Sequence, residues 1–171
     1  MNFELFLSRF KSTPDTLSAL LQDVPLEVAR WKPDANSWSM LEVICHMADE
    51  DRQDFRPRLK SLLFDEPVGS SITRIDPPAW VLECKYNDSD LSDSLSDFRL
   101  ERQESLRWLR ELPADLQLDR TAPDRDISAG QVLYSWLAHD YLHLRQITRL
   151  HYDFLILETP PYDLGYAGTW R

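Results

Sequence analysis

The sequence predicts an all-α protein, a four-helix bundle with a long crossover between its second and third helices. Three observations predict this class. Apolar residues recur at helical spacing over most of the chain, capping boxes mark two helix starts, and residues 91–112 alternate steps of four and three. Because 171 residues suit one domain, we expect a single bundle over 1–171, with an aromatic-rich tail from about 152.

The first helix is expected over residues 3–21, where the apolar side chains fall at helical spacing. Pro14 interrupts this segment, and Thr13 followed by Pro14 looks like an N-cap with proline at the first helical position. We therefore expect either one kinked helix or two helices here.

The second helix is expected to begin at Ser37 or Ser39, because Ser39 and Glu42 have the spacing of a capping box. An apolar stripe then continues to Leu62, and a bend is expected at Pro57. Residues 64–87 follow. This stretch is too long for a tight turn and predicts a crossover connection.

The third helix is expected to begin near residues 88–90 and to stop before Pro113. The fourth follows Ser128, which forms a second capping box with Gln131. The inward seam of this fourth helix consists of Val132, Trp136, His139, His143, Ile147 and Leu150.

Composition excludes several classes of function. The net charge of −10 repels phosphate backbones, so neither nucleic acid nor an anionic membrane is expected as a partner. Four glycines cannot form a dinucleotide fingerprint or a P-loop. The two cysteines form no disulfide framework, and the sequence contains no signal peptide or membrane span, so we expect a soluble cytoplasmic protein.

Two histidines, His139 and His143, are four residues apart and project from one face of the predicted fourth helix. They continue its apolar seam, where each unsatisfied polar group would cost roughly 1–3 kcal/mol. A bound metal ion would compensate for that cost. The alternative is two core histidines, each hydrogen-bonded to a serine, a tyrosine or a backbone carbonyl.

A metal needs more ligands, and the sequence offers only two other histidines, His46 and His151. His151 has rotated by about 120° from His139 around the helix, so we expect it near the helix end at the surface. His46 lies off the apolar stripe of its helix, which favours exposure. A bundle helix touches two neighbours, however, so a second inward edge is allowed.

Other metal plans fit the sequence less well. A di-iron carboxylate site needs Glu-x-x-His on two helices, and here only Asp140, before His143, is an acid at that spacing. Cys45 precedes His46, but neighbouring residues on a helix diverge by about 100°, so both side chains cannot easily face one ion. We expect Cys45 to be a small core residue.

Arg102 occupies a seam position of the third helix, where a charge must be paired or must face a cavity. One interpretation is an anchor for a substrate carboxylate above the metal. The other, which we favour, is an internal ion pair with Asp49 or Asp51. Trp80, in the crossover, is either a packing residue or the wall of a substrate pocket.

The chain resembles the DinB-like metal-binding four-helix bundles from about residue 6 to residue 147. The resemblance rests on Arg9-Phe10 with Thr13-Pro14, Trp31-x-Pro33, Trp38-Ser39-x-x-Glu42-Val43-x-x-His46, Ala79-Trp80, Phe98-x-x-x-Arg102, and His139-Asp140-x-x-His143-x-x-Gln146. It implies a three-histidine site at His46, His139 and His143 that holds a divalent metal such as zinc or nickel. It also implies frequent homodimers, and reactions that use a low-molecular-weight thiol such as bacillithiol, mycothiol or glutathione.

The family resemblance also points to an acid near the first histidine. Many relatives have glutamate five residues after it, where this chain has Asp51 beside Glu50. Together with Asp140, these acids are candidates to orient an imidazole or to accept a proton.

The leading hypothesis is a metal-dependent transferase or hydrolase in which a metal-bound thiolate or hydroxide attacks a small electrophile. A second hypothesis is a non-catalytic homodimeric metal-binding or stress-response protein that keeps the same fold. A third, a DNA-associated factor, is opposed by the net charge of −10.

Overall fold

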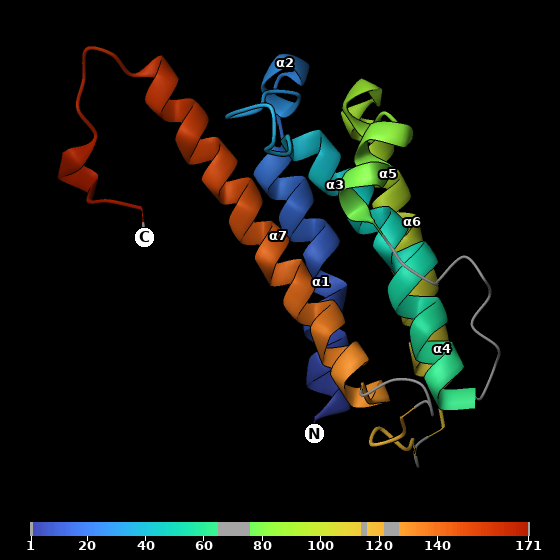
Figure 1. Cartoon of the computed structure of the whole chain (residues 1–171). Helices are drawn as coiled ribbons and strands as arrows, with labels where there is room; N and C mark the ends of the chain where they lie inside the picture. The colour runs from blue at the N-terminus through green and yellow to red at the C-terminus, as the bar shows by residue number, and fades with distance from the viewer. Residues whose placement is uncertain (1, 65–75, 114–115, 122–126, 171) are drawn as a thin grey trace.

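The computed structural model describes residues 2–64, 76–113, 116–121 and 127–170, and its long helices form a four-helix bundle (Figure 1). The bundle consists of α1 (Phe3–Leu21), α3 (Met40–Asp49) continued by η1 (Glu50–Phe55) and α4 (Arg56–Phe64), α6 (Leu91–Arg110), and α7 (Ala129–Glu158). Shorter elements are α2 (Leu26–Ala29), α5 (Pro77–Glu83), η3 (Tyr86–Asp88) and η4 (Gly165–Ala167). The predicted fold class is confirmed.

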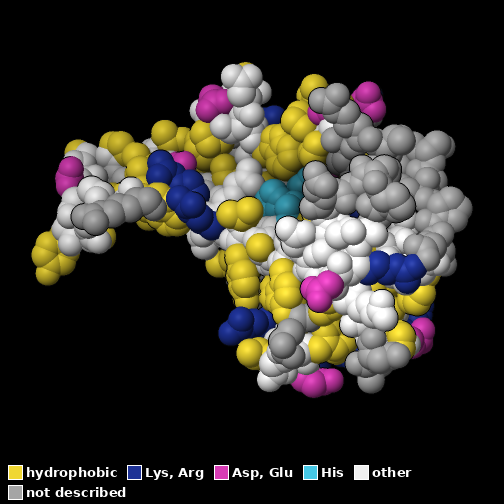
Figure 2. Space-filling view, turned by 60° about the horizontal axis from the view of Figure 1, so that its bottom comes forward, with side chains coloured by type: hydrophobic (Ala, Val, Ile, Leu, Met, Phe, Trp, Pro, Cys, Tyr) yellow, Lys and Arg dark blue, Asp and Glu magenta, His cyan; other side chains and the backbone are white. Residues whose placement is uncertain are grey.

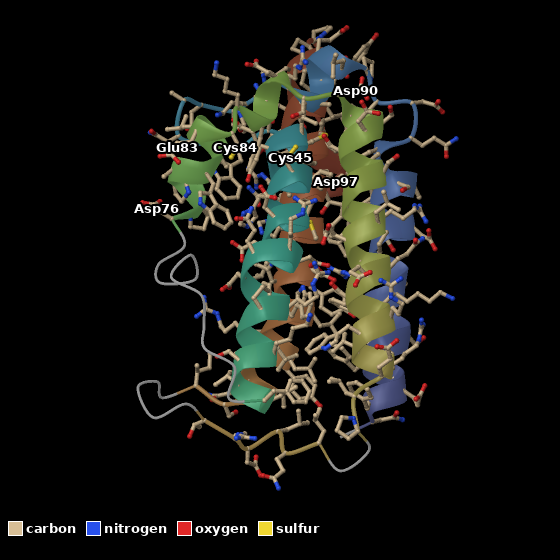
Figure 3. All side chains as sticks on the ribbon, turned by 90° about the vertical axis from the view of Figure 1, so that its right-hand side faces the viewer. Cys45, Asp76, Glu83, Cys84, Asp90 and Asp97 are labelled. Carbon is tan, nitrogen blue, oxygen red and sulfur yellow. The ribbon has the colours of Figure 1, made fainter. Side chains whose placement is uncertain are left out.

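The connection between the second and third long helices runs along the bundle. α1 packs against α6 and α7, and α3 packs against the same two helices. α4 ends at one end of the bundle, whereas α6 begins at the other end, near Asp90 (Figure 3). The chain must therefore cross over between them, and α5 with η3 forms the described part of that crossover. Residues 65–75 of the predicted crossover lie outside the described residues.

The predicted helix starts are found where the capping chemistry places them. Ser39 and Ser128 are the N-caps of α3 and α7, and both form complete capping boxes. Asp90 is the N-cap of α6, since its carboxylate accepts from the backbone N–H groups of Ser92 and Asp93.

α1 is a single helix that contains Pro14, so the alternative of two helices is wrong. Pro14 has no N–H to donate to the carbonyl of Phe10. The guanidinium of Arg102, on α6, donates to that carbonyl instead, at 3.0 Å. Thr13 is not an N-cap; its hydroxyl donates to Asp140 of α7 at 2.8 Å. A side chain from a distant segment therefore replaces the local hydrogen bond that proline removes.

The long second helix changes its winding directly after α3. Residues Glu50–Phe55 form a π-helical turn, and α4 then begins at Arg56. Pro57 follows at once and cannot make the regular backbone bond to the carbonyl of Gln53, so a wider turn is accommodated there. The π turn sets the directions in which Glu50, Asp51 and Phe55 point.

The core consists of two apolar clusters at different heights in the bundle. Phe10, Phe55, Leu106 and Trp136 belong to one cluster, and Leu17, Met47, Phe98 and Ile147 belong to the other. Between them, four buried polar side chains, one from each of the four helical segments, are joined by hydrogen bonds: Thr13, Asp51, Arg102 and Asp140. We call these four residues the polar layer.

The C-terminal part of α7 extends beyond the bundle. The helix continues to Glu158, through the first residues of the segment expected as an aromatic tail, and the following residues lead away from the bundle (Figure 1). Trp170 packs against Tyr152 with ring centroids 5.4 Å apart, and Phe154 packs against Trp31. Among the described residues, no helix has the length and hydropathy needed to cross a membrane.

Candidate metal centre

Three histidines from two distant segments converge between α3 and α7. The Nε2 atom of His139 lies 3.2 Å from Nε2 of His46 and 3.0 Å from Nε2 of His143. One ligand atom from each of the three side chains lies within 4.8 Å of the others. The sequence could place only His139 and His143 together by spacing; the fold adds His46 from a position 93 residues away.

His46 is buried, so the second inward edge of its helix is the correct interpretation. Nine of the ten residues of α3 are buried, because this helix packs against α6 and α7 as well as α5 and η3. A single apolar stripe therefore could not indicate which side chains face inward. His139 is half-buried, and Figure 2 shows histidine atoms at the surface beside hydrophobic side chains.

Aromatic rings fix the orientation of the imidazoles. Trp38 packs edge-on against His46, with centroids 4.8 Å apart, and lies nearly parallel to His143 at 6.3 Å. Phe55, from the π turn, contacts His139 at 5.2 Å. Sequence analysis missed Trp38 and Phe55 as site residues, since aromatic residues at such positions are more often core residues.

Hydrogen bonds at the opposite ring nitrogens decide which nitrogen can bind a metal. The side-chain oxygen of Gln146 lies 2.8 Å from Nδ1 of His143, so that nitrogen donates and Nε2 keeps a free lone pair. Gln146 follows His143 by three residues, and this helical spacing is the signal that could have identified it. Nδ1 of His46 is buried without a hydrogen bond and lies 3.7 Å from Glu50.

The three imidazoles are neutral at neutral pH. Burial is the main cause and the neighbouring histidines add to it; together they lower the pKa of His46 to about 3 and that of His139 to about 2. Burial also lowers the pKa of His143. Neutral imidazoles offer the lone pairs that transition metals bind, and three of them directed at one point are the ligand set of catalytic zinc sites. These residues therefore fit a divalent metal ion.

Glu50 is a buried acid beside the histidines, with a carboxylate oxygen 3.7 Å from Nδ1 of His46. Its side chain is almost wholly buried in the π turn, and burial, with the nearby charge of Asp54, raises its pKa to about 8. Arg58 opposes this shift but does not cancel it. A carboxyl group with such a pKa can gain or lose a proton near neutral pH.

The carboxylates of Asp51 and Asp140 already accept hydrogen bonds within the polar layer. The guanidinium of Arg102 donates to both carboxylates over distances of 2.6 to 3.1 Å. The indole N–H of Trp136 also donates to Asp51, at 2.6 Å. Arg102 is 1% exposed, so its guanidinium serves an internal ion pair, with Asp51 as one of its two partners.

The remaining candidates lie away from the histidine cluster. Asp49 does not pair with Arg102; it accepts from Tyr86 and from Arg52. Trp80 is half-buried on α5, and within the described part of the chain no hydrogen bond or ring contact joins it to the histidines. The thiol of Cys45 lies 3.3 Å from the hydroxyl of Ser94 on α6, and His151 is outside the cluster.

A sequence profile of the DinB superfamily matches residues 9–147, most of the chain. The chain belongs to the DinB superfamily. No curated protein matches this DinB protein. Both histidine segments lie within the matched range, and so does the whole polar layer.

Among solved structures, the DinB protein is similar to YfiT from Bacillus subtilis, with a TM-score of 0.72 and 22% sequence identity. The likeness covers 86% of this chain and 84% of YfiT. YfiT is described as a probable metal-dependent hydrolase with an unusual four-helix bundle topology. At this identity the comparison establishes a shared fold.

The lowered histidine pKa values predict how the metal-free protein responds to acid. The unfolded chain takes up protons near pH 6.5, whereas folded His46 stays neutral down to about pH 3. Stability should therefore fall as the pH drops from about 7 to about 5, by up to about 1.4 kcal/mol per pH unit for each such histidine. Glu50 has the opposite sign, since its raised pKa favours the folded state at low pH.

Urea unfolding at several pH values, with metal removed by a chelator, measures this slope. His139→Gln should give a shallower dependence than wild type, because one lowered pKa is removed, and Glu50 is common to both proteins. His151→Gln is the matched control and should keep the wild-type slope. Equal slopes for wild type and His139→Gln would contradict the prediction.

Proposed function

We propose that this DinB protein is a metal-dependent enzyme that acts on a small electrophile, as a hydrolase or as a transferase that uses a low-molecular-weight thiol. The observation that carries the proposal is the convergence of three neutral imidazole nitrogens from α3 and α7. A divalent ion held by three neutral ligands keeps its full charge and lowers the pKa of a bound water or thiol. Zinc and nickel both suit such a ligand set.

An open coordination position distinguishes a catalytic from a structural site. Within the described ranges, no fourth histidine, cysteine or acidic side chain joins the three histidines. His139 also reaches the surface. These features favour the enzyme over the alternative of a non-catalytic metal-binding or stress-response protein, which would need a closed set of ligands.

Glu50 is the acid that we assign to proton transfer. The oxygens of Asp51 and Asp140 already accept from Arg102, whereas Glu50 faces Nδ1 of His46 at 3.7 Å. A nearby cation would stabilise its carboxylate, so Glu50 would release its proton when the cation binds. The carboxylate could then orient His46 or accept the proton of the attacking water or thiol.

Metal content tests the proposal first. Purified wild type should bind about one divalent ion per chain, and His46→Ala or His139→Ala should lower this content at least tenfold, because each removes a ligand. Elemental analysis after dialysis gives the stoichiometry, and His151→Ala is the matched control. Full metal content in His139→Ala would exclude the site.

Glu50→Gln separates proton transfer from metal binding. Glutamine keeps the size of the side chain and an oxygen that faces His46, but it cannot take up a proton. We expect wild-type metal content and a kcat lowered about 100-fold. The assays are hydrolysis of para-nitrophenyl acetate, and conjugation of monochlorobimane with and without glutathione.

The two assays also decide between the alternatives. Turnover only when thiol is present supports the transferase, and turnover without thiol supports the hydrolase. A metal-loaded wild type that turns over neither probe faster than His46→Ala would favour the non-catalytic protein. Unchanged turnover in Glu50→Gln would remove Glu50 from the mechanism.

We further propose that the protein forms a homodimer through the protruding end of α7 and the tail. Large apolar side chains are exposed there, and such surface on a protruding element is typical of an interface. The exposed residues are Leu155, Ile156, Leu157, Tyr162 and Tyr166.

Light scattering coupled to size exclusion tests this partner. Wild type should have the mass of a dimer, and Leu157→Glu should shift the mass toward that of a monomer, because a charge would be buried. Leu100→Glu is the control, since Leu100 is equally exposed but lies on α6. A monomeric wild type would contradict the proposal.

A further inference from the structure

Arg102 forms the centre of the polar layer. Its Nε donates to Asp51 at 2.8 Å, and its two terminal nitrogens donate to Asp51, to Asp140 and to the carbonyl of Phe10. The rings of Phe10 and Phe98 pack against the guanidinium, with centroids 3.6 and 4.9 Å from Cζ. One side chain thus joins α6 to α1, η1 and α7.

The two carboxylates that Arg102 holds lie next to the metal ligands along the chain. Asp140 directly follows His139 and precedes His143 by three residues on α7. Asp51 follows His46 by five residues on the continuous second helix. α6 contributes no histidine to the cluster, yet its Arg102 binds both helices that do. The hydroxyl of Thr13, on α1, also donates a hydrogen bond to Asp140.

Stability alone does not explain this layer. Two buried carboxylates and a guanidinium must all leave water, and apolar side chains of similar volume often give an equally stable core. An apolar cluster lies on each side of the polar layer. A planar guanidinium fixes two carboxylates at defined positions through paired hydrogen bonds. Apolar contacts have no such directional preference.

We propose that Arg102 is a positioning residue for the metal centre. By holding Asp51 and Asp140, it sets the distance between the helix that carries His46 and the helix that carries His139 and His143. Metal affinity and coordination geometry therefore depend on a residue that touches neither the metal nor its ligands. This inference rests on the proposed metal-binding function.

Cobalt(II) binding tests the proposal without any assay of activity. Its affinity is measured by competition with a chelating indicator, and its absorption spectrum reports coordination geometry. Arg102→Lys keeps the charge but loses the planar fork, and Arg102→Met loses both. We expect cobalt affinity to fall at least tenfold in Arg102→Met and by a smaller factor in Arg102→Lys, with an altered spectrum in each.

Leu109→Ala is the matched control. Leu109 is fully buried on α6, about two helical turns from Arg102, in the apolar cluster that contains Phe10 and Trp136. Its truncation should lower the melting temperature and leave cobalt affinity within about threefold of wild type. A loss of affinity in Leu109→Ala equal to that in Arg102→Met would show that general destabilisation, and not positioning, weakens the site.

Thr13→Val covers the case in which the Arg102 variants do not fold. It removes only the hydroxyl that donates to Asp140, so it should fold and show a smaller but measurable loss of cobalt affinity. Wild-type affinity and spectrum in every folded variant would overturn the inference while the metal site stands. Failure of the wild type to bind cobalt would instead overturn the proposed function.

Discussion

The buried ion pairs of Arg102 are the constraint on which the rest of the structure depends. The guanidinium sits where the four helical segments meet and divides the core into two apolar clusters. Asp51 and Asp140 can be buried only because it is there, since an unpaired carboxylate would cost several kcal/mol. The proline in α1 also depends on it, through the carbonyl of Phe10.

The sequence predicted what local chemistry decides. The starts of α3, α6 and α7 follow from Ser39, Asp90 and Ser128, whose side chains satisfy backbone groups a few residues away. The pair His139 and His143 follows from the geometry of one helix. The third histidine came from the family resemblance, because a helical wheel assumes one inward face and α3 is buried on nearly all sides.

What sequence reasoning missed depends on contacts between distant segments. Thr13 and Pro14 have the local pattern of a helix start, but Asp140 and Arg102 supply the bonds that let the helix continue. Trp38 became a site residue only when α7 and the loop before α3 were placed together. No pattern within one segment indicates such partners.

The π turn has a consequence for the comparison of this protein with its relatives. A π turn rotates the backbone by a smaller angle per residue than a regular α-helix. It therefore changes the direction in which each later side chain of the helix points. An acid five residues after the first histidine faces Arg102 here, while the acid one position earlier faces the imidazole. In a homologue with a regular helix at this point, the same alignment column would point elsewhere. Equivalent acids must therefore be matched by direction in space rather than by column.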